Sequence, residues 1–252
     1  MYNLIILGGS GNIGIELLKR LQHKNLFEKI FVLDINIEPL EFLKSNNKIE
    51  IIKSDIVNQN YLLNIISKEE NIEIKILNLV AKDYPVTKDG LNKEFSSPFS
   101  LSTKEYIDSI KITAGSTYNL LHQITKLKLY QVDIILISSI YEFNLPDSDL
   151  YSNNKFKIFK PIAYSSGKAA QSPLLKQAAK ILGPKGGRCN CLSFGGIKSN
   201  QNQIFIEKYS KKTPQGKMIE MDDVIKMIIW LFIESPHSIN GENIMVDGGF
   251  TC

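Results

Sequence analysis

The sequence predicts an α/β fold in which seven parallel strands form one doubly wound sheet within a single domain. Short runs rich in isoleucine, leucine and valine recur along the chain without polar alternation, as strands covered on both faces require. Helical stretches separate these runs, and such alternation gives right-handed crossovers between parallel strands. With 252 residues, of which 43% are hydrophobic, the chain is long enough to bury the core of such a domain.

The elements follow one another in a regular order. The predicted strands are residues 4–7, 30–33, 49–53, 74–80, 132–138, 188–194 and 243–246. The predicted helices are residues 13–21, 61–68, 104–126, 164–182, 203–211 and 222–233. No linker, repeat or second-domain break divides residues 1–252, so we expect one Rossmann-type domain. Two segments, 83–103 and 141–161, are more irregular, and long irregular loops in compact domains tend to be functional.

A glycine-rich turn between the first strand and the first helix predicts a dinucleotide site. Its sequence is Gly8-Gly9-Ser10-Gly11-Asn12-Ile13-Gly14. Glycine permits a tight turn and lets backbone N–H groups approach a pyrophosphate at the helix N-terminus. The expected cofactor contacts in the turn are Gly8, Ser10, Gly11, Asn12, Ile13 and Gly14. The alternative is a tight turn that binds no ligand.

Carboxylates end the next two predicted strands. Asp34 stands where a carboxylate accepts hydrogen bonds from a ribose diol and repels a 2′-phosphate. Because no arginine lies nearby to hold that phosphate, we expect NAD rather than NADP. Asp34 has the alternative of capping a helix or turn. Asp55 and Ile56 close the third strand, where the adenine would lie, and Asp55 serves equally well as a cap for the following helix.

The spacing of Tyr164 and Lys168 predicts a paired phenol and ammonium. Residues four apart on a helix lie on the same face, about one turn apart. An ammonium held there stabilises the phenolate and lowers the tyrosine pKa, so that the phenol exchanges a proton with a substrate alcohol. A surface pair has the same spacing, and the surrounding motifs decide between the two interpretations.

Composition and charge argue against several functional classes. The net charge is only +4, and no lysine cluster with interleaved aromatic residues indicates nucleic-acid binding. The three histidines show no ligand spacing, so we expect no metal site. Cys189 and Cys191 fall in a predicted strand, where we expect buried structural thiols on opposite faces. No segment has the pattern of a signal peptide or the length of a membrane span, and we expect a cytoplasmic protein.

Five ordered motifs resemble the short-chain dehydrogenase/reductase family, in its compact single-domain branch, over the whole chain. They are the glycine-rich turn, Ser138-Ser139, Tyr164-Ser165-Ser166-Gly167-Lys168, and the segments 188–199 and 239–249. The resemblance implies an NAD-dependent oxidoreductase acting on a CH–OH group. It also implies a homodimer or homotetramer paired through the two longest predicted helices.

The resemblance assigns roles to individual residues. Ser139 would stabilise the substrate oxygen, Tyr164 would be the general acid/base, and Lys168 would lower the Tyr164 pKa and bind the nicotinamide ribose. Ile197 and Ser199 would hold the nicotinamide carboxamide. The implied cofactor contacts beyond the glycine-rich turn and the strand-end carboxylates are Ala81, Tyr164, Lys168, Gly195, Ile197 and Ser199.

The chain departs from the family pattern at the proton relay. The family's Asn-Asn-Ala-Gly motif reads Asn78-Leu79-Val80-Ala81-Lys82 here, so that only Ala81 corresponds. The family's relay asparagine falls in register with Lys111 or Ala114. These departures affect the relay more than the NAD site.

An enlarged loop at residues 141–161 makes the resemblance specific to one group within the family. Ser139 and Tyr164 are 25 positions apart, a longer gap than is usual in the family. The loop carries five aromatic side chains, which suit sugar rings, and Lys155, Lys157 and Lys160, which suit phosphates. With segments 137–141, 193–201 and 246–250, it resembles the bacterial flagellin modification protein A group, which is associated with legionaminic-acid-type sugars. The alternative is a loop that packs on a neighbouring subunit.

Three functions follow from these patterns. The first is oxidation or reduction of a sugar or amino-sugar phosphate or nucleotide with NAD. The second is an epimerase or dehydratase that retains its NAD, because the even spacing of Gly8, Gly11 and Gly14 resembles that extended branch. The third is a non-catalytic NAD-binding scaffold, suggested by the missing relay asparagine.

Overall fold

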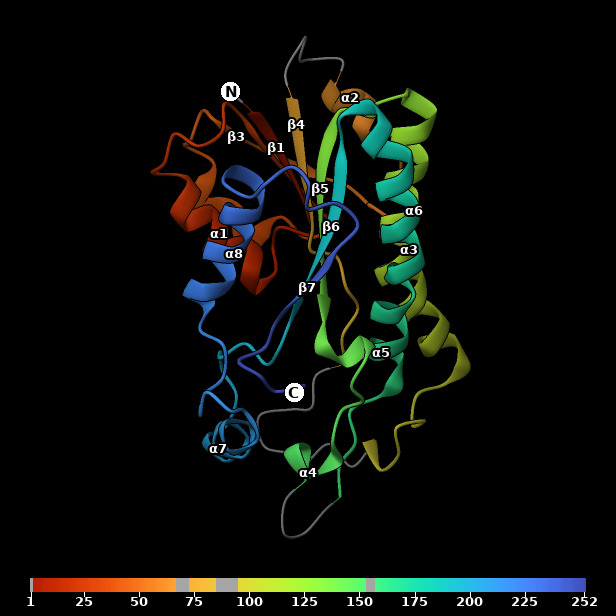
Figure 1. The fold of residues 1–252 in the computed structure, drawn as a ribbon, viewed down its shortest axis with the longest axis vertical. Helices are drawn as coiled ribbons and strands as arrows, with labels where there is room; N and C mark the ends of the chain where they lie inside the picture. The colour runs from red at the N-terminus through yellow and green to blue at the C-terminus, as the bar shows by residue number, and fades with distance from the viewer. Residues whose placement is uncertain (1, 67–72, 85–94, 153–156) are drawn as a thin grey trace.

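Seven parallel strands form one sheet in the order β3-β2-β1-β4-β5-β6-β7, which confirms the predicted α/β fold (Figure 1). The structure is a computed structural model that describes residues 2–66, 73–84, 95–152 and 157–252. The strands are β1 (Tyr2–Leu7), β2 (Ile30–Asp34), β3 (Ile49–Lys53), β4 (Glu73–Asn78), β5 (Val132–Ser139), β6 (Arg188–Phe194) and β7 (Asn243–Val246). The order reverses between β1 and β4, and such a switch point is where open α/β sheets bind ligands.

Helices cover both faces of the sheet. Helices α1 (Asn12–Leu21) and α8 (Met221–Ile233) lie on one face. Helices α2 (Leu62–Ile66), α3 (Thr103–Leu127) and α6 (Gln171–Leu182) lie on the other, as Figure 1 shows. Helix α5 (Ile162–Ala169) packs on α3, whereas α4 (Ser148–Tyr151) and α7 (Gln203–Lys212) lie beyond the carboxyl ends of the strands. Short 3₁₀ turns are η1 (Glu38–Leu43), η3 (Ile140–Glu142) and η4 (Gly183–Lys185).

The core explains why the strand sequences do not alternate. In β1, Leu4 and Ile6 pack toward α1 and α8, while Ile5 and Leu7 pack toward α2, α3 and α6. Successive side chains of a strand point to opposite faces, so both sets must be apolar when helices cover both faces.

Several predicted elements differ from those in the structure. The predicted helix 164–182 is two helices, α5 and α6, with a break at Ala170. Pro173 has no N–H to donate to Ala169 and its ring crowds that carbonyl, which explains the break. Strand β4 ends at Asn78 instead of residue 80, because the Asn78 side chain accepts the Val80 N–H. The 3₁₀ turn η1 was not predicted, and the last two residues of the predicted helix 61–68 lie outside the described residues.

Cys189 and Cys191 are buried, but the prediction that they point to opposite faces is wrong. Both thiols belong to the core on the α3 and α6 side, because residues two apart in a strand share a face. Within the described ranges, no three His, Cys, Asp or Glu side chains are grouped to hold a metal ion. No helix of the described chain is both long enough and apolar enough to cross a bilayer.

A buried cluster of charged side chains joins three strands at their amino ends. Asp133 of β5 lies between Lys75 of β4, at 2.9 Å, and the Nε atom of Arg188 of β6, at 3.1 Å. The Lys75 and Arg188 side chains are each only 5% exposed. One carboxylate thus compensates two buried cations, and its loss leaves both charges without a counter-ion among the described residues.

We expect Asp133→Asn to destabilise the protein by about 3 kcal/mol, because it removes the negative charge that the buried Lys75 and Arg188 share. Urea unfolding measures the change. Asp222→Asn is the control, because Asp222 pairs with Arg20 at the surface, where both side chains are well exposed and the pair contributes little. Equal unfolding midpoints for the two variants would contradict this account of the cluster.

Candidate active site

A cavity of about 910 Å³ opens at the carboxyl ends of the strands. It lies where β1, β4, β5 and β6 end, beside the switch point of the sheet. The predicted site residues that line it are Gly8, Gly11, Asn12, Ile13, Gly14, Ala81, Ser139, Tyr164, Lys168, Gly195, Ile197 and Ser199. The predicted residues outside its lining are Ser10, Asp34, Asp55 and Ile56. Segments more than 150 positions apart in the sequence therefore meet around one space.

The glycine-rich turn is shaped for close approach to the backbone. Gly8 has a φ of +78°, and a Cβ at Gly14 would lie 2.3 Å from the Gly9 carbonyl oxygen, so neither position tolerates a side chain. At Gly11 the nearest atom to such a Cβ is 3.8 Å away, which leaves open space. Gly11 also precedes α1 without any side-chain cap from the described residues. The exposed N–H groups at the start of α1 therefore fit a pyrophosphate.

Asp34 braces the glycine-rich turn from the end of β2. Its Oδ2 atom accepts the Ser10 N–H at 3.0 Å, and its Oδ1 atom accepts the Asn36 N–H at 3.1 Å. Each carboxylate oxygen has a second lone pair, so these bonds leave acceptor capacity for a ribose hydroxyl. The turn-capping alternative for Asp34 and the ribose contact are therefore compatible.

Asp55 caps the turn that follows β3. Its carboxylate accepts the N–H groups of Val57 and Asn58 and the Asn58 side-chain amide. The hydrogen bond from the Asn58 side chain is the main reason that the pKa of Asp55 is lowered. Asn119 of α3 donates to the Ile56 carbonyl at 2.7 Å and so anchors this turn. A contact of Asp55 or Ile56 with adenine stays a proposal.

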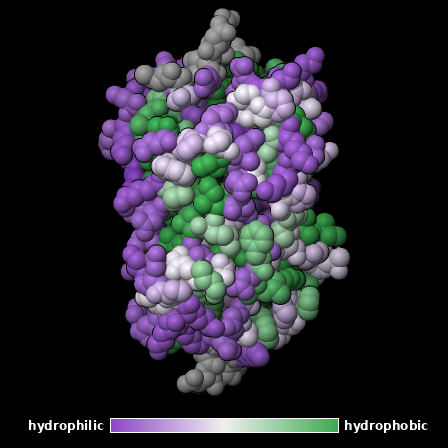
Figure 2. All heavy atoms as spheres, viewed as in Figure 1, coloured by the Kyte–Doolittle hydropathy of each residue, from purple (hydrophilic) through white to green (hydrophobic). Residues whose placement is uncertain are grey.

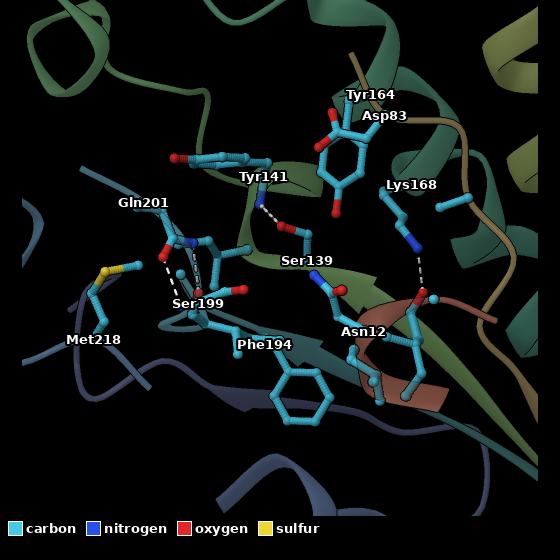
Figure 3. A pocket seen from close by; sticks show the side chains of 18 of the residues that line it. Asn12, Asp83, Ser139, Tyr141, Tyr164, Lys168, Phe194, Ser199, Gln201 and Met218 are labelled. Atoms are coloured by element: carbon cyan, nitrogen blue, oxygen red, sulfur yellow. Dashed lines mark hydrogen bonds between the residues drawn. The ribbon is translucent and has the colours of Figure 1, made fainter. Parts of the chain in front are cut away.

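Ser139, Tyr164 and Lys168 converge on one wall of the cavity. In Figure 3 the Tyr164 hydroxyl points toward Ser139, and Lys168 extends beside them. Ser139 ends β5 and its Oγ accepts the Tyr141 N–H at 3.2 Å, which fixes the serine rotamer. Lys168 donates to the Ile137 carbonyl at 2.5 Å, and its Nζ atom lies 5.9 Å from the Tyr164 ring centroid. The three polar groups are placed to hold a substrate oxygen and exchange its proton.

The pKa of Tyr164 shifts in the direction opposite to the predicted one. Burial raises the pKa of Tyr164 above its ordinary value, the Asp83 carboxylate raises it further, and a side-chain hydrogen bond with Ser139 lowers it. Burial lowers the pKa of Lys168 to about 8. The net direction for Tyr164 is opposite to that expected from Lys168, because desolvation of the phenolate dominates and the ammonium is directed at a carbonyl.

The substrate end of the cavity is built from the enlarged loop and α7. Tyr141 and Tyr151 share a hydroxyl–hydroxyl hydrogen bond of 2.8 Å, and both line the cavity. Lys208 of α7 donates to the carbonyls of Asp149 and Ser152, which ties the loop to the body of the domain. Residues of the described part of the loop therefore border the cavity. Lys155, and Phe156 of its aromatic set, lie outside the described residues.

The positions in register with the relay asparagine, Lys111 and Ala114, do not line the cavity. Helix α3 holds the segment after β4 by other groups: Thr113 Oγ1 accepts the Lys82 N–H at 3.0 Å, and Ser109 donates to the Lys82 carbonyl at 3.1 Å. These contacts fix the path of the chain from Ala81 to Asp83 along the cavity wall.

Two acidic residues at the site were missed from the sequence. Asp83 lines the cavity, and Glu142 accepts hydrogen bonds from Ser138 and, at 2.9 Å, from Asn243. Burial raises the pKa of Glu142. Both residues follow the carboxyl end of a central strand, and that position was the available signal for Asp83.

A family model described as enoyl-(acyl carrier protein) reductase matches residues 83–251. The chain belongs to the short-chain dehydrogenase/reductase family. The resemblance of its five motifs is thereby confirmed, and membership identifies an NAD(P)-dependent oxidoreductase with a Rossmann-type fold.

Three similar proteins match over nearly the whole chain. The post-translational flagellin modification protein A of Campylobacter coli is 28% identical, over 98% of this chain and 97% of its own length. A short-chain dehydrogenase from Leptospira borgpetersenii with bound NAD⁺ is 26% identical, with a TM-score of 0.79 over 100% of this chain and 93% of the other. ElxO with bound NADP, at 22% identity, shares the fold with a TM-score of 0.76 over 99% of this chain and 98% of its own.

The depressed pKa of Lys168 predicts a pH-dependent stability. Between pH 8 and about 10 the unfolded chain retains the Lys168 proton while the folded protein loses it, so folded stability rises with pH in this window. We expect Lys168→Met to remove that part of the rise, which amounts to at most about 3 kcal/mol. Urea unfolding at several pH values measures it.

Lys180→Met, at an exposed position of α6, is the matched control and should keep the wild-type slope. A Lys168→Met protein whose stability follows the wild-type pH dependence would refute the assignment of this proton to Lys168.

Proposed function

We propose that the protein is an NAD-dependent oxidoreductase acting on a secondary alcohol or ketone of a sugar-type substrate. The observation that carries the proposal is the convergence of Ser139, Tyr164 and Lys168 on the cavity that the glycine-rich turn also lines. The substrate would be a sugar or amino-sugar phosphate or nucleotide in bacterial surface-glycan synthesis of the legionaminic-acid type. The similarity to flagellin modification protein A and the aromatic substrate end support this class.

The chain's own residues divide the work of such a reaction. When bound, the nicotinamide supplies the hydride acceptor or donor. Ser139 Oγ would hold the substrate oxygen, and the Tyr164 hydroxyl would accept or return its proton. Lys168 would bind the nicotinamide ribose, and Ile197 and Ser199 the carboxamide. The start of α1 would hold the pyrophosphate through its N–H groups.

The even spacing of Gly8, Gly11 and Gly14 favours a second candidate, a sugar epimerase or dehydratase that retains NAD through its cycle. A non-catalytic NAD-binding scaffold is the third. NAD that copurifies with the protein, together with turnover that forms no net NADH, would favour the epimerase or dehydratase.

We further propose a cytoplasmic location and a homodimer or homotetramer. Cys189 and Cys191 are free thiols, as is usual in a reducing compartment. Ile107 and Tyr118 of α3 and Ile181 of α6 are large apolar side chains that are exposed, and they support pairing through these helices. Figure 2 also shows hydrophobic residues gathered along the middle of one face, over β7, an edge strand of the sheet.

Tyr164→Phe should lower turnover by at least about 100-fold, because the substrate proton then has no acceptor. NAD should still bind, since the pyrophosphate and ribose contacts remain. NADH absorbance with a panel of sugar phosphates and nucleotide sugars, and calorimetry with NAD, measure the two quantities. Normal turnover by this variant would eliminate Tyr164 as the acid/base.

Asp34→Asn should raise the use of NADP relative to NAD by about tenfold or more, because it removes a negative charge beside the 2′-position. The asparagine amide oxygen can still accept the Ser10 N–H, so the glycine-rich turn keeps its brace. The ratio of kcat/KM values for the two cofactors is the measurement. An unchanged ratio would show that Asp34 does not select the cofactor.

A further inference from the structure

Asp83 and Lys160 form an ion pair in the wall of the cavity, beside the proposed acid/base. Lys160 Nζ lies 2.6 Å from Asp83 Oδ1 and 4.8 Å from the centroid of the Tyr164 ring. The Lys160 side chain is 8% exposed and that of Asp83 is 45% exposed. Figure 3 shows the Asp83 carboxylate next to the Tyr164 ring. The pair therefore adjoins the place where a substrate would react.

The carboxylate of Asp83 keeps acceptor capacity in this arrangement. Both of its recorded bonds, from Lys160 and from the Tyr84 N–H at 2.8 Å, use Oδ1. No described residue donates to Oδ2. An acceptor of this kind in a cavity wall favours a ligand that brings an O–H or N–H donor.

Each cation that lines the cavity already donates to an acceptor of the protein. Within the described chain they are Lys160, which is bonded to Asp83, and Lys168, which is bonded to the Ile137 carbonyl. Lys157, another lysine of the enlarged loop, is exposed and lies over the Phe159 ring at 5.4 Å from its centroid. Among the described lining residues, neither cation is free of an acceptor, so a phosphate beside the reacting carbon would meet the Asp83 charge without a cation directed at it.

We infer that Asp83 is a specificity-determining residue that accepts a hydrogen bond from a hydroxyl or acylamino group on the carbon next to the reacting carbinol. Lys160 holds the carboxylate in place. This inference rests on the proposed function and narrows its substrate to molecules that are uncharged around the reacting carbon. Any phosphate or nucleotide then lies further along the molecule.

The same contact links substrate recognition to the acid/base. The Asp83 carboxylate contributes to raising the pKa of Tyr164, after burial. A donor that binds Asp83 spreads its negative charge and weakens this contribution. A substrate with the right neighbouring group would thereby ease deprotonation of the phenol.

The experiment measures binding without turnover, in NAD-loaded protein carrying Tyr164→Phe. The probes are cyclohexanol, trans-cyclohexane-1,2-diol, trans-2-acetamidocyclohexanol and trans-2-hydroxycyclohexyl phosphate, followed by ligand-observed NMR. The diol and the acetamide should bind about tenfold more tightly than cyclohexanol, since each adds one hydrogen bond to a carboxylate. The phosphate should bind more weakly than the diol.

Adding Asp83→Asn should remove most of the preference for the diol over cyclohexanol and should improve binding of the phosphate. Asp149→Asn is the control, because Asp149 is an exposed carboxylate of the enlarged loop that does not line the cavity. It should leave all four affinities unchanged. Diol binding that is equal with and without Asp83, or no binding of any probe, would overturn the inference.

The proposed function fails by a different observation. The diol could bind in an Asp83-dependent way while the wild-type protein, with Tyr164 intact, forms no NADH from the diol or from any sugar of the panel. In that case the recognition role of Asp83 stands and the oxidoreductase assignment falls.

Discussion

The bond from the buried Lys168 ammonium to the Ile137 carbonyl, at 2.5 Å, is the contact on which the arrangement of the site depends. A buried ammonium requires a hydrogen-bond acceptor, and this one lies within β5, two residues before the strand ends. The bond therefore fixes α5 against β5. Tyr164 lies one helical turn before Lys168 and is carried over Ser139 by the same contact. Helix and strand are thus held in one register by a group that also belongs to the proposed chemistry.

The amino ends and the carboxyl ends of the strands carry different kinds of structure. At the amino ends, the cluster around Asp133 pairs buried charges of neighbouring strands. At the carboxyl ends, β5 ends in Ser139, glycines follow β1 and β6, and the segments after the strands leave a cavity. Parallel strands bring all their carboxyl ends together, so residues distant in the sequence meet around this cavity.

The substrate end is assembled from parts that lie far apart in the chain. Three kinds of contact hold together the enlarged loop, helix α7 and the segment after β4. They are the Lys208 bonds, the Tyr141–Tyr151 pair and the Asp83–Lys160 pair. Each of these contacts is polar and specific in geometry. Such contacts limit which ligand groups fit in this part of the cavity.

The sequence alone determined that the strands are parallel, where the glycine-rich turn lies, and that Tyr164 and Lys168 share a helix face. These features depend on local patterns, namely apolar runs, glycine positions and helical periodicity. Tertiary structure decided what periodicity cannot encode. The break at Ala170, the direction of the Tyr164 pKa and the pairing of Asp83 with Lys160 depend on burial and on residues far apart in the chain. Desolvation and ion pairing act through space, and only the folded chain sets those distances.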